Sequence, residues 1–167
     1  MFDYEEYEKE CNKIRQDNNE LLSLFEGELL GSGLTAKTVN RHLANVDFYI
    51  NEYLLREEPL PMVYGTVRLD MFLGDFFIRK CMWSTPGSIK STAASIKKFY
   101  KCMLTHGKIN KKHYDCLCDD IREGMDQWQY DCAVFNDPDA PIHLTDSDQF
   151  LQGANDYVSA KKQEQRR

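Results

Sequence analysis

The stretch from Gly31 to Leu55 constrains the fold of this chain more than any other part of the sequence. Gly33 can end a preceding helix in a left-handed conformation, and Thr35 can cap the next helix. Apolar residues then recur at the spacing of an amphipathic helix with one buried face. These residues are Val39, Leu43, Val46, Ile50 and Tyr53. The stretch therefore predicts a helix over residues 36–55 that packs on one side only.

Similar helical patterns, separated by glycine and proline, continue along the chain, and no segment shows strand alternation bounded by hairpin turns. Thr85 before Pro86 is a typical helix start, and Asn110 can cap a later helix. We therefore expect an all-α fold, a small bundle of four to five helices with an acidic C-terminal helix and tail. The expected helices are residues 17–30, 36–55, 66–79, 86–104 and 110–135, with a short last helix over 144–157.

Length and cysteine content limit the class of protein. At 167 residues the chain can bury roughly two-thirds of its unfolded surface, so disulfides are not needed to hold a core. Six cysteines without an apolar leader segment favour free thiols in a reducing, cytoplasmic compartment. No apolar run reaches the length of a membrane span, so we expect no membrane partner. We divide the chain into an acidic extension (1–16), a helical domain (17–135) and a linker with a short helix and flexible tail (136–167).

The charges of the chain are segregated along the sequence. A net charge of −6 would by itself argue against nucleic acid as a partner. Residues 76–114, however, hold nine basic residues and no acidic one, whereas residues 115–160 hold eleven acidic residues and one basic one. Such a block predicts a basic surface that the average charge conceals.

Three passages resemble a known module. The first is Leu30-Gly31-Ser32-Gly33-Leu34-Thr35-Ala36-Lys37-Thr38-Val39 with the long helix after it, and the second is the aromatic helix over residues 66–79. The third runs from Gly87-Ser88-Ile89-Lys90 through Ser95-Ile96-Lys97-Lys98-Phe99-Tyr100-Lys101 to Leu104-Thr105-His106-Gly107-Lys108-Ile109. Together they make residues 21–110 similar to the N-terminal, SAM-like core-binding domain of tyrosine recombinases of the phage-integrase family.

The resemblance implies a helical bundle that arches over one face of duplex DNA. The spacing of the fourth helix agrees, because Ile89, Ile96 and Met103 form its apolar stripe while Lys90 and Lys97 lie opposite. Lysine and serine mainly contact phosphates, so we expect weak sequence specificity and strong salt dependence. The implied DNA-binding residues are Lys37, Thr38, Arg41, Lys90, Ser91, Ser95, Lys97, Lys98 and Lys101.

The chain departs from that family in its chemistry. A tyrosine recombinase needs a second domain with clustered arginines, a His-x-x-Arg element and a nucleophilic tyrosine. No histidine of this chain is followed by arginine three residues later, and only residues 142–149 faintly resemble the start of such a domain. The chain is then either a stand-alone relative that kept the DNA-binding bundle or a piece of a longer recombinase. In both cases we expect it to have no enzymatic activity.

Alternative interpretations remain open for these patterns. The lysine-rich helix face can be an ordinary solvated surface, and the acidic segment 115–160 can solubilise the protein, mask the basic face or bind a basic partner. A regulatory or protein-interaction module, with self-association through the acidic helix, is therefore the competing hypothesis. His113 and Cys116 lie one turn apart with Cys118 and Cys132 nearby, but no Cys-x-x-Cys pair occurs. We expect neither a metal nor another cofactor.

Overall fold

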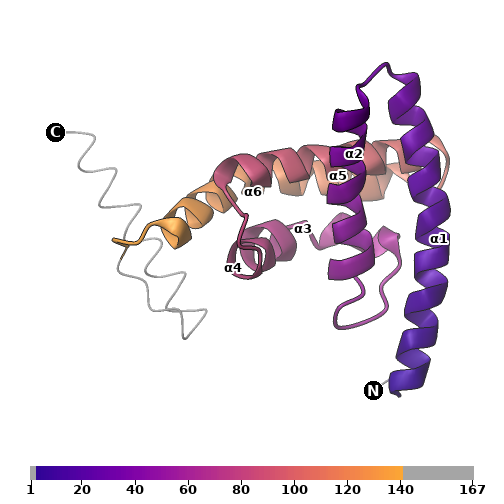
Figure 1. Ribbon diagram of the computed structural model, residues 1–167, viewed down its shortest axis with the longest axis horizontal. Coiled ribbons are helices and arrows are strands. Elements are labelled where there is room, and N and C mark those ends of the chain that lie inside the picture. Colours follow the sequence, from indigo (N-terminus) through magenta and orange to yellow (C-terminus); the bar gives the residue numbers. More distant parts are fainter. Residues whose placement is uncertain (1–2, 141–167) are drawn as a thin grey trace.

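The computed structural model describes residues 3–140, and the regular elements in that range are helices (Figure 1). The all-α class is therefore confirmed for this part of the chain. The last helix predicted from the sequence, residues 144–157, lies outside the described residues. Within residues 3–140, no helix has both the length and the apolar content to cross a membrane. All six cysteines are unpaired thiols, as the sequence predicts.

The first helix, α1 (Tyr4–Gly31), is longer than expected. The predicted start near Asp17 is wrong, because the N-terminal half of α1 packs against the end of the second helix. Cys11 and Ile14 are buried there in a small apolar cluster with Leu55. Charged residues surround these two positions in the sequence, so the apolar pattern is too sparse to mark a helix. The acidic stretch at the start of the chain is thus helical and packed from Tyr4 onward.

The junction between the first two helices follows the prediction closely. Gly33 has a φ of +78°, a left-handed conformation that other residues adopt at a cost. The Thr35 side chain accepts a hydrogen bond from the Thr38 backbone N–H at 3.3 Å, which caps α2 (Ala36–Asp47). The chain continues as a π-helical turn (Phe48–Tyr53), so the helical rod has the predicted extent.

The third predicted helix is divided into short pieces. A 3₁₀ segment (Met62–Val67) leads into α3 (Leu69–Met71), then a π-helical turn (Phe72–Phe76) and α4 (Phe77–Lys80). This aromatic region lies in the core, since the Phe72 ring centroid lies 4.8 Å from that of Tyr49 and 4.7 Å from that of Tyr53.

The last two described helices form an antiparallel pair. The Thr85 and Ser88 side chains form a capping box at the start of α5 (Pro86–Thr105). Gly107, with a φ of +71°, reverses the chain, and Asn110 caps α6 (Lys111–Asn136). Figure 1 shows α5 and α6 running side by side across α1 and α2, with α3 and α4 beneath α6.

Two further contacts fix α1 on the rest of the bundle. The Phe25 ring meets that of Phe99 on α5 edge-on, with centroids 5.5 Å apart. The buried Asn18 amide donates to the Asn51 side-chain oxygen at 2.8 Å and to the Ile50 carbonyl at 3.3 Å. Because buried polar groups without partners are costly, these bonds set the register of α1 against the π-helical turn that follows α2.

Candidate nucleic-acid interface

The cations predicted to bind DNA are exposed on two helices that pack together. Lys37 and Arg41 lie on the first turns of α2, and the lysines of α5 lie along one side of that helix. The exposed α5 lysines are Lys90, Lys97, Lys98 and Lys101. Because α2 packs against α5, the two sets of cations lie on adjoining helices.

The hydroxyl residues of the predicted site are less available than the cations. The expectation that Ser95 contacts DNA is wrong, because its side chain is 0% exposed and lies between α2 and α5. Ser91 is half-buried, and so is Thr38, whose hydroxyl accepts a hydrogen bond from the Thr35 hydroxyl at 3.0 Å. The fully exposed members of the predicted set are therefore its lysines and its arginine.

Ser95 instead joins the two helices in a buried polar network. Its hydroxyl oxygen lies 2.7 Å from His42 Nδ1 and accepts a hydrogen bond from the Asn45 side-chain amide at 3.0 Å. Burial lowers the pKa of His42 below its ordinary value, and the charges of Arg41 and Lys98 lower it further. Arg41 on α2 and Lys98 on α5 therefore both lie close enough to this imidazole to disfavour its protonated form.

These cations are not neutralised within the part of the chain that the structure describes. Its ion pairs are Asp75 with Arg79, Asp115 with Lys111, and Asp119 with Arg122. None of them includes a basic residue of the predicted site. The Lys101 ammonium lies 5.3 Å from the centre of the Tyr114 ring on α6. A surface of unpaired cations is suited to a polyanion.

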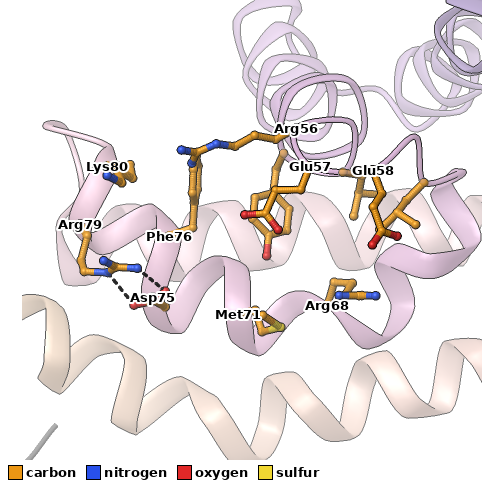
Figure 2. Close-up of a pocket in the computed structure, with 12 residues that line it drawn as sticks. Arg56, Glu57, Glu58, Arg68, Met71, Asp75, Phe76, Arg79 and Lys80 are labelled. Atoms are coloured by element: carbon orange, nitrogen blue, oxygen red, sulfur yellow. Dashed lines mark hydrogen bonds and ion pairs between the residues drawn. The ribbon is translucent and has the colours of Figure 1, made fainter. Parts of the chain in front are cut away.

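A separate pocket opens beside the π-helical turn that follows α2, at the end of this helical rod away from Lys37 and Arg41 (Figure 2). Its volume is about 220 Å³. One wall is the connector Arg56-Glu57-Glu58 and the facing wall carries Arg68, Met71, Asp75 and Arg79. The sequence analysis missed it, because the pocket exists only where the connector folds back over α3 and α4.

Charges of both signs line this pocket. The Arg56 guanidinium lies 4.8 Å from the centre of the Phe76 ring, and Arg79 donates two hydrogen bonds to the Asp75 carboxylate. Burial raises the pKa of Tyr53. The charge of Arg68 lowers this pKa, and the charge of Glu57 raises it. The pocket is therefore not an extension of the cationic surface on α2 and α5.

The potential metal ligands considered in the sequence are not brought together. The His113 imidazole accepts a hydrogen bond from the Asn110 backbone N–H as part of the α6 capping box, and Cys132 is buried. The structure instead gathers Glu28, Cys102 and His106, whose ligand atoms all lie within 4.8 Å of one another.

Comparison of the chain with models of protein families, with curated proteins and with solved structures gives no significant match.

Proposed function

We propose that this chain is a non-catalytic DNA-binding module of the type that serves tyrosine recombinases as a SAM-like core-binding domain. The observation that carries the proposal is a set of exposed cations on α2 and α5 without a carboxylate partner among residues 3–140. The cations are Lys37, Arg41, Lys90, Lys97, Lys98 and Lys101.

The surface between the lysines supports close approach by a phosphate backbone. Ala94 is exposed between Lys90 and Lys97 on α5, so no bulky side chain stands between these cations. The hydrogen bonds of Ser95 to His42 and Asn45 join α5 to α2. Lysine and arginine on two packed helices favour binding to the phosphate backbone of DNA, with little discrimination among base sequences.

Binding of a labelled duplex of about 20 base pairs, followed by fluorescence anisotropy over a salt series, tests the proposal. We expect binding at low salt with an affinity that falls steeply as salt rises. The double variant Lys97→Glu with Lys98→Glu is expected to weaken binding by at least about tenfold at low salt.

The matched control is Lys9→Glu with Lys13→Glu, which makes the same change in net charge on two exposed residues near the start of α1. It is expected to bind DNA much more strongly than the α5 variant. Absence of binding at low salt, or equal losses in both variants, would contradict a DNA interface on α5.

Light scattering separates this function from the competing one. A DNA-binding module is expected to be a monomer that gains mass when duplex is added. A protein-interaction module that uses the acidic residues of α6 would gain mass by self-association or by binding a basic protein. It would gain no mass when duplex is added.

A further inference from the structure

Three side chains of different chemistry meet where the end of α1 packs on the end of α5. They are a carboxylate, a thiol and an imidazole from Glu28, Cys102 and His106, and one ligand atom of each lies within 4.8 Å of the others. Cys102 is buried, whereas Glu28 and His106 are exposed at the surface. The group therefore lies at the boundary between the core and solvent.

The fold places these residues together through ordinary packing. Cys102 and His106 are four residues apart, so they project from the same side at the end of α5. Gly107 then turns the chain away, which leaves the imidazole uncovered. On α1, the buried Leu29 next to Glu28 and the contact of Phe25 with Phe99 fix the height of α1 against α5.

We propose that Glu28, Cys102 and His106 bind a Zn²⁺ ion that joins α1 to α5. Thiolate, imidazole and carboxylate are the three ligand types that zinc takes in proteins, and two of them here come from a helical i, i+4 pair. Ligand atoms around tetrahedral zinc lie about 3.5 Å apart. Rotation of the exposed Glu28 and His106 side chains closes the remaining gap, and water takes the fourth position.

Protons and charges balance in this step. Burial and the neighbouring Glu28 raise the pKa of the Cys102 thiol to about 12 in the metal-free protein, so the ion must displace this proton to solvent as it binds the sulfur. Glu28 supplies a carboxylate oxygen to the metal. The site would replace the sequence-based expectation that the chain holds no metal, and it is independent of the proposed DNA surface.

A Co²⁺ titration of the full chain tests the proposal, since cobalt reports sulfur ligation by a near-ultraviolet charge-transfer band. The parent protein carries Cys116→Ser and Cys118→Ser, because these half-buried thiols on α6 could bind cobalt themselves. We expect one Co²⁺ per chain, a sulfur band that Zn²⁺ removes, and loss of that band in Cys102→Ser.

The exposed ligands provide variants that leave the core intact. His106→Ala and Glu28→Gln are expected to weaken Co²⁺ binding by at least about tenfold. The controls are His113→Ala and Glu26→Gln, which change the same residue types on α6 and on α1. Both controls are expected to keep the parent affinity.

Zn²⁺ is also expected to raise the melting temperature of the parent more than that of His106→Ala at the same concentration, because tighter binding to the folded state stabilises it more. The proposal is overturned if the parent shows no sulfur band, if the band survives Cys102→Ser, or if His106→Ala binds Co²⁺ as tightly as the parent. Should Cys102→Ser fail to fold, the two exposed variants decide the question.

Discussion

At the scale of single residues, the junction between α2 and α5 depends on one hydroxyl group. Ser95 is within hydrogen-bond distance of His42 and Asn45, and it donates to the Ser91 carbonyl at 3.2 Å. Its small side chain lets the two helices approach each other. The residue predicted to touch DNA therefore acts by holding the helices that carry the cations.

Replacement Ser95→Ala is expected to destabilise the protein by about 1–3 kcal/mol, because it leaves buried polar atoms of His42 and Asn45 without a partner. Urea unfolding measures the change. Ser23→Ala, at an exposed position of α1, is the control and should have little effect. A loss below about 0.5 kcal/mol at Ser95 would mean that its neighbours find other partners.

His42 is expected to make stability depend on pH. Burial and two nearby cations lower its pKa below the ordinary value of 6.5, so the unfolded chain binds the proton more tightly than the folded protein. The stability that the neutral His42 imidazole contributes is therefore fully present above pH 6.5. It is lost as the pH falls from 6.5 towards the lower pKa of the folded protein. The free energy of unfolding should fall on acidification, with a shallower fall in His42→Gln.

NMR titration of the imidazole gives the direct measurement. We expect a pKa below the ordinary value for the protein alone, and a rise when duplex DNA is added, because phosphates at Arg41 and Lys98 would offset their repulsion of the protonated ring. An ordinary pKa in the protein alone, or no response to DNA, would contradict this account of the surface.

Residue spacing predicted the exposed cations but not this network. A helical period of 3.6 residues separates a lysine stripe from an apolar stripe within α5 alone. Ser95 lies between those stripes, and its burial is decided by α2, which comes from a distant part of the sequence. The meeting of Glu28 with Cys102 and His106 escapes sequence analysis for the same reason.

At the scale of elements, the helix caps were predicted correctly. Thr35, Thr85 and Asn110 cap helices as predicted, because a cap depends only on the backbone of the next three residues. The start of α1 was not predictable in this way, since its N-terminal half is held by the distant Leu55. The two π-helical turns, Phe48–Tyr53 and Phe72–Phe76, were likewise not predicted, and their aromatic rings pack against one another in the core.

A pair of glycine substitutions separates helix propensity from packing. Gly27 on α1 has no neighbour near the position of an added Cβ, so Gly27→Ala is expected to stabilise the protein by up to about 1 kcal/mol. Gly124 on α6 lies against the Trp128 ring, where an added methyl group would overlap the indole. Gly124→Ala is therefore expected to destabilise by about 1–3 kcal/mol.

The contacts of Trp128 explain why its ring cannot simply turn away to relieve that overlap. Its indole N–H donates to the Asp70 carboxylate at 2.6 Å, and Gly74 lies against the same ring. Thermal unfolding of both alanine variants measures the contrast. Stabilisation by Gly124→Ala would show that helix propensity outweighs packing at this contact.

At the scale of the whole molecule, opposite charges are carried by neighbouring helices. The lysines of α5 face outward, and α6 beside it presents exposed acids such as Glu123 and Asp126. Packed helices lie about 8–10 Å apart, which is close to the Debye length of about 10 Å at 0.1 M salt. The acidic helix therefore weakens the field that a phosphate meets over α5.

Removal of those acids is expected to strengthen DNA binding in a salt-dependent way. Glu123→Gln with Asp126→Asn should raise the affinity severalfold at about 0.01 M salt, where the Debye length is about 30 Å. The gain should shrink near 0.15 M, where that length is about 8 Å. Anisotropy titrations at both concentrations measure it, with Glu5→Gln and Glu6→Gln on α1 as the control of equal charge. An equal gain from the control would show that net charge alone governs the affinity, and that the proximity of α6 to the lysines has no part in it.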